Sequence, residues 1–187
     1  SYNEAFTVTV TNVNEAPTDI ALSNSSLAEN TDTTGGLAVG NLSTTDDDAG
    51  DTFSYAVVGG ADAAVFSISG NQLIITDGVL DFETKNSYAV DVEVTDQGGA
   101  GLTFTKSFTV TVTNVNEAPT DLAVDNLTVA ENAAGAVIGN VSVTDPDAGD
   151  THTYSVDDAR IEVVGGVLRL VAGQSLDFES EPSVSEI

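Results

Sequence analysis

One stretch of this sequence occurs twice. The fourteen residues FTVTVTNVNEAPTD run from Phe6 to Asp19 and return, letter for letter, from Phe108 to Asp121. A verbatim repeat 102 positions apart in a chain of 187 residues does not arise by chance, so the chain is built from tandem units. A unit of about 100 residues is long enough to bury a hydrophobic core of its own.

The repeat divides the chain unevenly. We expect residues 1–15 to be the last strand and linker of a preceding unit, residues 16–117 to be one complete unit, and residues 118–187 to be a second unit that stops before its last two strands. The chain therefore resembles a fragment of a longer array. We expect the second unit to be weakly stable, because missing strands leave an open core and unpaired edges.

The hydrophobic pattern predicts an all-β fold. Phe6, Val8 and Val10 alternate with threonines, which is the period of two of a half-buried strand. Short strands at regular spacing, separated by glycine-rich breaks, predict tandem Greek-key β-sandwiches of immunoglobulin-like shape. The expected strands cover residues 20–22, 37–42, 53–57, 66–68, 73–76, 88–94 and 108–112 in the first unit, and 123–129, 137–143, 152–156, 161–163 and 167–170 in the second.

Composition excludes several classes of partner. With 30 acidic and 4 basic residues the formal charge is −26, so nucleic acid and anionic membrane surfaces, which require clustered Lys and Arg, are excluded. There is no cysteine to form a disulfide, and no apolar run has the length of a membrane span, so we expect no membrane insertion. The acidity itself has three explanations: general solubility, adaptation to salt, or binding of cations.

The positions of the acids favour cations. They recur in LAEN and VAEN, in TDDDAGD and TDPDAGD, in LDFE twice and in NVNEAP twice; Asp96, in VTDQGG, has no counterpart. Clustered carboxylates repel one another unless they share a hard cation, and Ca²⁺ takes about six to eight oxygen ligands. Without cysteine, and with His152 as the one histidine, a transition-metal site is not expected. Solvated acidic loops are the alternative to Ca²⁺ sites.

The order of these motifs resembles the cadherin repeat, in the form of the bacterial cadherin-like repeats of large RTX-type adhesins. The series is Glu29, the Asp46-x-Asp48 loop, VFSISGNQLII, LDFE, VEVTDQGG and NVNEAP. The resemblance implies cadherin-type sandwiches with Ca²⁺ at the junctions between consecutive domains. The linker carries only Glu117 where the family usually has two aspartates, which favours two ions at a junction over three.

The resemblance implies three sets of ligands. The set around the linker at residues 114–119 is Glu29, Asp81, Glu83, Asn114, Asn116, Glu117, Asp145 and Asp147; the set around residues 12–17 is Asn12, Asn14, Glu15, Asp46, Asp48 and Asp96; the third is Glu131, Asp177 and Glu179.

The leading hypothesis is a structural extender of a secreted or surface-anchored bacterial adhesin, stiffened by Ca²⁺ and joined to neighbouring repeats of the same protein. The alternative is a module that binds polysaccharide or another copy of itself. The absence of tryptophan argues against the animal mode of homophilic adhesion, which uses an N-terminal Trp. An enzyme is not expected, because no nucleophile and base accompany the carboxylate pairs.

Overall fold

The computed structural model describes residues 1–98 and 101–184, so Gly99 of the VTDQGG motif lies outside the described residues. The chain divides into two compact units, Ser1–Val115 and Asn116–Ile187, which are described separately below. Among the described residues, no helix has the length and apolar character needed to cross a membrane.

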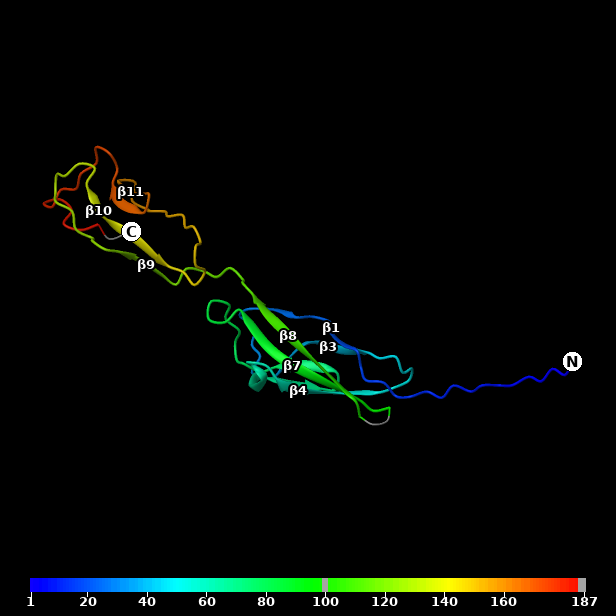
Figure 1. Cartoon of the computed structure of the whole chain (residues 1–187). Helices are drawn as coiled ribbons and strands as arrows, with labels where there is room; N and C mark the ends of the chain where they lie inside the picture. Colours follow the sequence, from blue (N-terminus) through cyan, green and yellow to red (C-terminus); the bar gives the residue numbers. More distant parts are fainter. Residues whose placement is uncertain (99–100, 185–187) are drawn as a thin grey trace. The chain divides into compact units, whose positions relative to one another are not determined.

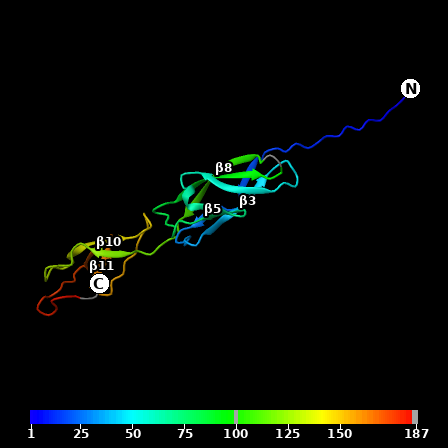
Figure 2. The same cartoon turned by 90° about the horizontal axis from the view of Figure 1, so that it is seen from below.

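The first unit contains a sandwich of two four-stranded sheets (Figure 1). One sheet has the order β1-β3-β6-β5 and the other the order β2-β8-β7-β4, and Figure 2 shows β8 in one layer with β3 and β5 in the other. The strands are β1 (Asp19–Leu22), β2 (Ser26–Ala28), β3 (Leu37–Thr45), β4 (Phe53–Gly59), β5 (Phe66–Ser69), β6 (Gln72–Ile75), β7 (Ser87–Asp96) and β8 (Thr103–Thr113); a 3-10 turn, η1 (Ala63–Val65), precedes β5.

The alternating residues of β7 and β8 form the centre of this core. Val90, Val92 and Val94 of β7 are at most 1% exposed, whereas the residues between them face outward or are half-buried. Val110 and Val112 of β8 point to the same side. Among the described residues, thirteen buried apolar side chains form one cluster between the two sheets. The predicted sandwich is confirmed.

The sequence pattern did not predict β2. These three residues, Ser-Leu-Ala, are too few to show an alternation, yet they pair in parallel with the end of β8, with Ser26 opposite Thr111 and Ala28 opposite Thr113. The pairing brings Glu29, the next residue, to the end of β8, where the linker begins.

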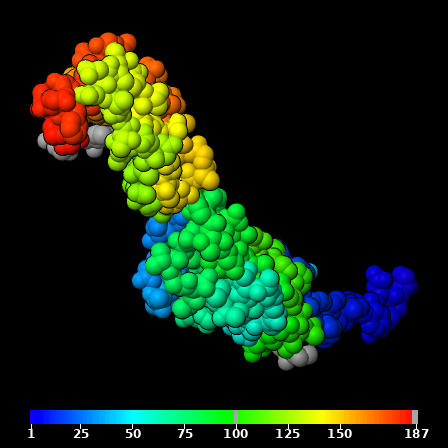
Figure 3. All heavy atoms as spheres, turned by 90° about the vertical axis from the view of Figure 1, so that its left-hand side faces the viewer, coloured from blue at the N-terminus to red at the C-terminus, as the bar shows by residue number. Residues whose placement is uncertain are grey.

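The strand expected at residues 6–10 does not form. Phe6, Val8 and Val10 are between 84% and 90% exposed, and the segment is extended without a paired neighbour among the described residues. Figure 3 shows it as a thin projection, coloured dark blue. The identical residues of β8 are a strand because β7 lies beside them, so the partner and not the local sequence decides the structure.

The second unit has one sheet, in the order β11-β12-β10-β9. Its strands are β9 (Asp121–Val124), β10 (Val137–Thr144), β11 (Ile161–Val164) and β12 (Val167–Leu170). Two expectations were wrong here: β9 is shorter than residues 123–129, and residues 152–156 form no strand. In the first unit the matching strand, β4, pairs with β7 alone, and the second unit of this sequence has no counterpart of β7.

The core of the second unit is small. Among the described residues, four buried apolar side chains form its cluster: Ile138, Ile161, Leu168 and Leu170. Beside them lies an open groove of about 1070 Å³, lined in part by Leu122, Val141 and Val156. The stabilisation from burial scales with the apolar area removed from water, so this unit is expected to be less stable than the first.

Candidate metal centres

Within residues 1–98 and 101–184, the fold gathers the acidic motifs into four groups of three carboxylates. Within each group, one oxygen atom per residue lies within 4.8 Å of the others. We name each group by its first residue: the Glu29 cluster (Glu29, Asp81, Glu83), the Asp46 cluster (Asp46, Asp48, Asp51), the Asp145 cluster (Asp145, Asp147, Asp150) and the Glu131 cluster (Glu131, Asp177, Glu179).

The Glu29 cluster lies where β8 leaves the sandwich. The Glu29 side chain is 3% exposed, and its two oxygens accept different backbone N–H groups: Oε1 from Val115 at 2.6 Å and Oε2 from Phe82 at 2.9 Å. Asn114 Nδ2 donates to Glu83 Oε1 at 3.3 Å. The predicted ligands Glu29, Asp81, Glu83 and Asn114 are therefore brought together within the first unit.

The LDFE turn holds its aspartate by local hydrogen bonds. Asp81 accepts from the backbone N–H and from the hydroxyl of Thr84, both at 2.8 Å, and these bonds keep the pKa of Asp81 below its usual value. The carboxylate thus stays ionised and oriented. On the other side of the cluster, Asn30 takes φ = 60°, a left-handed conformation that Asn tolerates better than most residues.

The Asp46 cluster lies at the opposite end of β8, about 35 Å away along an eleven-residue strand. Asp48 accepts from the side-chain amide of Asn12 with one oxygen and from the backbone N–H of Glu15, at 2.7 Å, with the other. Asn14 donates its amide to Asp96, the last residue of β7. The predicted set around residues 12–17 is therefore also brought together.

Two oxygens of this cluster have no donor. Asp46 Oδ2 and Asp51 Oδ2 are buried without a hydrogen-bond partner among the described residues. Burial, and then the neighbouring Asp96 carboxylate, raises the pKa of Asp51. In contrast, the backbone N–H of Glu15 and the amide of Asn12 lower the pKa of Asp48. Buried acceptors that lack donors are costly, and a cation would satisfy them.

The Asp145 cluster repeats this geometry in the second unit. The Asp147 N–H donates to Asp145 Oδ1 at 3.0 Å, as Asp48 does to Asp46 at 2.9 Å. Asp147 is 6% exposed, and its Oδ2 accepts the backbone N–H of Glu117 at 2.6 Å. Asn116 donates to the backbone oxygen of Glu117 at 3.0 Å.

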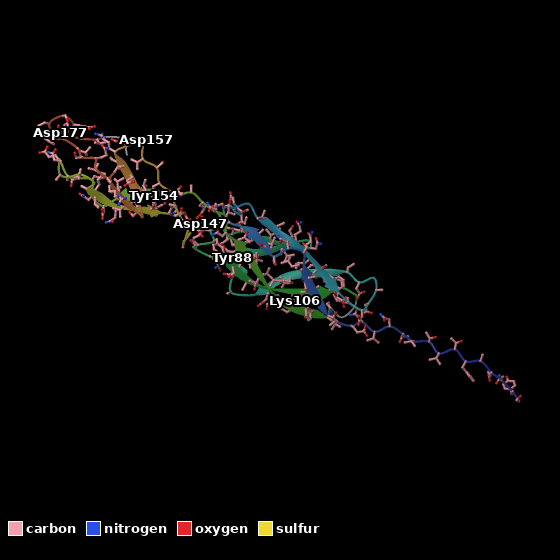
Figure 4. All side chains as sticks on the ribbon, turned by 90° about the horizontal axis from the view of Figure 1, so that it is seen from above. Tyr88, Lys106, Asp147, Tyr154, Asp157 and Asp177 are labelled. Atoms are coloured by element: carbon pink, nitrogen blue, oxygen red, sulfur yellow. The ribbon has the colours of Figure 1, made fainter. Side chains whose placement is uncertain are left out.

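The Glu131 cluster is the most open of the four, because all three of its members are exposed. Glu131 Oε2 accepts the Phe178 N–H at 3.3 Å, the counterpart of the bond between Phe82 and Glu29. Figure 4 shows Asp147 and Asp177 at opposite ends of the second unit, so each unit carries acids at both ends.

Sequence reasoning left two cluster members out of its ligand sets. Asp51 and Asp150 belong to the repeated TDDDAGD and TDPDAGD motifs, so their shared position was a usable signal. The part played by the backbone N–H groups of Glu15, Val115 and Glu117 carries no signal in the sequence, because every residue except proline has such a group.

The donor set fits calcium. The side-chain groups are carboxylates and amides, which are hard oxygen ligands. Among the described residues, the two buried oxygens without a donor, Asp46 Oδ2 and Asp51 Oδ2, would be satisfied by a cation. Glu29, Asp81, Glu83 and Asn114 would hold an ion at one end of the first unit, and Asp46, Asp48, Asp51, Asp96, Asn12 and Asn14 at the other.

Comparisons with known proteins agree with this geometry. Residues 24–113 match the model of the Cadherin domain family. Over 118 residues, 61% of this chain and 6% of the relative, the chain is 37% identical to human protocadherin-15; over 158 residues, 75% of the chain and 20% of the relative, it is 34% identical to cadherin-8 of Rattus norvegicus. The chain thus spans only a small part of these relatives.

Solved structures share the fold. The extracellular cadherin domains 1–4 of protocadherin gamma B7 superpose with a TM-score of 0.63 and 25% identity, over 86% of this chain and 42% of that one. Domains EC1-2 of human protocadherin-24 give a TM-score of 0.65 at 19% identity, over 90% of this chain and 82% of that one. Cadherin domains are extracellular adhesion domains that bind Ca²⁺, and the family is not one of enzymes. Residues 24–113 are thus identified as a cadherin domain.

Proposed function

We propose that this chain is an extender stiffened by calcium, in which ions at the junctions of consecutive repeats hold an array extended and project a distal part of a larger protein. In this proposal residues 16–117 are one repeat, residues 118–187 belong to the next, and residues 1–15 belong to the one before. The ligand sets are those that the sequence predicted, with Asp51 and Asp150 added.

The observation that carries the proposal concerns two backbone N–H groups. The Val115 N–H is held by Glu29 of the first unit, and the Glu117 N–H is held by Asp147 of the second. These residues are two positions apart, a reach of about 7 Å in an extended chain. Each unit therefore anchors the same short linker with a buried carboxylate. The bond between the Glu15 N–H and Asp48 repeats the arrangement at the preceding linker.

The ion is what makes such a linker stiff. Without it, clustered carboxylates repel one another and favour a loose linker. With it, ligands from two consecutive repeats bind the same divalent cation. Extracellular modules bind Ca²⁺ with dissociation constants of about 10⁻⁴ to 10⁻³ M. A tenfold excess over that constant adds about 1.4 kcal/mol of stability per independent site, so several sites together are comparable with the stability of a domain.

Small-angle X-ray scattering tests this proposal. The chain is measured in millimolar CaCl₂, in chelator, and in chelator with NaCl at matched ionic strength, which separates specific binding from screening. We expect a larger radius of gyration and a more rigid profile with Ca²⁺ alone. Identical profiles in all three buffers would show that the acids are solvated surface, and the extender function would then be rejected.

The second candidate is adhesion through self-association. It is favoured by family membership, and one structure with this fold, at 22% identity, is described as a protocadherin gammaB7 EC3-6 cis-dimer. Sedimentation in CaCl₂ would reveal a mass that rises with concentration if copies of this chain associate. Binding of polysaccharide would require Ca²⁺-dependent retention on a glycan array.

The sequence motifs also suggest the kind of protein from which the chain comes. We place the chain in a surface protein of the bacterial RTX type, although the relatives named above are mammalian. The chain covers only 6% and 20% of those relatives, so the match does not imply that it shares their partners.

A further inference from the structure

The LDFE turns of the two units end in the same conformation. The Lys85 N–H donates to the Asp81 carbonyl, and the Glu181 N–H donates to the Asp177 carbonyl, both at 2.9 Å. The hydroxyls of Thr84 and Ser180, one residue earlier, donate to the carboxylates of these same aspartates. Lys85 and Glu181 are therefore equivalent residues with opposite charges.

Both side chains form an ion pair with the turn that precedes the same strand of the sandwich. Lys85 pairs with Asp62, just before β5, and Glu181 pairs with Arg160, just before β11. The two turns are equivalent, because the carbonyls of Val65 and Arg160 accept matching backbone bonds, each at 2.8 Å, from the residue after the following hairpin. The charges are reversed, and the partner sits at a different position of the turn: Arg160 matches Val65, whereas Asp62 lies three residues before Val65.

Each pair is supported by further contacts. In the first unit, the second oxygen of Asp62 accepts the Ala89 N–H of β7 at 2.8 Å, and Lys85 Nζ lies 4.2 Å from the centre of the buried Tyr88 ring. In the second unit, the guanidinium of Arg160 binds Glu181 through two nitrogens and also binds Asp158. Such bidentate geometry fixes orientation as well as distance.

Basic residues are rare in this chain, which makes their use informative. Two of the four, Lys85 and Arg160, take part in these pairs, while 30 acids compete for them. The charges of the two partners are reversed between the units. Both units therefore retain the ion pair between the two turns, but not the residue types that form it. The link begins two residues after a cluster carboxylate: Lys85 follows Glu83, and Glu181 follows Glu179.

We propose that Lys85 and Glu181 are positioning residues that fix the two LDFE turns against the sandwich, so that the carboxylates of each turn face Glu29 or Glu131 before an ion arrives. This inference rests on the proposed calcium function. Without an ion, the two carboxylates of the turn and the neighbouring glutamate repel one another, and the ion pair limits how far the turn can move. Pre-ordering the turn lowers the entropic cost of binding.

Calorimetric titration of the full chain with CaCl₂ tests the inference. Lys85→Met removes the charge at similar length, Lys85→Arg keeps it, and Lys106→Met is the matched control. Lys106 also pairs with an aspartate, Asp19, and lies over a ring, Phe108, but the register places it opposite Val92, four residues along β7 from Tyr88. Figure 4 labels Tyr88 and Lys106 at separate places in the first unit.

We expect Lys85→Met to weaken the affinity of the site at the Glu29 cluster by about three- to tenfold, while Lys85→Arg and Lys106→Met bind as the parent chain does. Both methionine variants make the chain more negative by one charge, which by itself would attract Ca²⁺ more strongly. A loss confined to Lys85→Met therefore reflects positioning and not net charge.

Hydrogen exchange of residues 81–86 in chelator gives a second readout, in which Lys85→Met should exchange faster than the parent chain. If the parent chain binds Ca²⁺ and Lys85→Met binds equally well, the positioning role is overturned and the calcium function stands. If the parent chain does not bind, the calcium function fails first. Should Lys85→Met not fold, hydrogen exchange of residues 177–182 in chelator tests the same role in Glu181→Gln, and unchanged exchange would overturn it.

Discussion

Glu29 Oε1 accepts a hydrogen bond from the backbone N–H of Val115 at 2.6 Å, although 86 positions separate the two residues. The other oxygen of Glu29 accepts the Phe82 N–H, so one buried carboxylate joins the end of β2, the LDFE turn and the start of the linker. Glu29 therefore has a structural role in addition to its role as a candidate ligand. The two roles separate when stability is measured without calcium.

Replacing Glu29 with Gln is expected to destabilise the first unit by about 1–3 kcal/mol in chelator, because the amide NH₂ must face a backbone N–H and one donor loses its acceptor. Urea denaturation, with unfolding monitored by the hydrogen exchange of β7 and β8, measures the change in the free energy of unfolding. Glu131→Gln, at the exposed counterpart, should change it by less than about 0.5 kcal/mol. Equal losses in the two variants would contradict the buried role of Glu29.

Replacing Asp147 with Asn is expected to weaken Ca²⁺ binding at the Asp145 cluster by about tenfold, because the affinity of such sites depends on the number of charged ligands. The Asn oxygen can still accept the Glu117 N–H, so the fold should persist. Asp121→Asn, an exposed change of the same charge on β9, is the control and should leave calorimetric binding unchanged. Equal affinity in the two variants would remove Asp147 from the ligand set.

Leu73 of β6 is completely buried, so Leu73→Ala should cost about 2–5 kcal/mol of unfolding free energy through lost apolar contacts and the cavity left behind. Val58→Ala, at a side chain that is 52% exposed on β4, should change stability by less than about 0.5 kcal/mol. Urea denaturation in constant calcium compares the two. A small effect at Leu73 would mean that the sheets pack less closely than described.

The second unit should lose stability in acid through Asp158. Hydrogen bonds from Arg160 lower the pKa of Asp158 to about 2, below an unfolded value of about 3.9. The folded state therefore binds fewer protons, and this stabilisation is present above about pH 4 and lost as the pH falls toward 2.

Thermal unfolding in chelator between pH 5 and pH 2 measures this contribution. Arg160→Met should flatten the dependence, whereas Arg169→Met, which breaks the more exposed pair with Glu162, should keep it. Parallel pH curves for the parent chain and Arg160→Met would contradict the assignment.

The grouping of the acidic residues was largely predictable, because their motifs occur at equivalent places in two copies. Comparison of the copies identified Glu29 with Glu131 and Asp81 with Asp177, and the fold groups each with the predicted neighbours. The donors that hold them were not predictable. The N–H groups of Val115 and Glu117 carry no sequence signature. Comparison of the two copies does not reveal the ion pair between Lys85 and Asp62, because the equivalent pair in the second unit has the opposite charges.

The sequence by itself determined the repeat, the β-sandwich and the positions of the clustered acids, since periodicity and motif spacing are properties of residues that lie near one another in the chain. The tertiary structure decided which segments become strands. Phe6–Val10 and Phe108–Val112 have identical sequences, yet only the second is a strand, because β7 and β2 supply backbone partners on both of its sides. A lone extended segment leaves its backbone hydrogen bonds to water, and its pattern cannot reveal whether a partner is present.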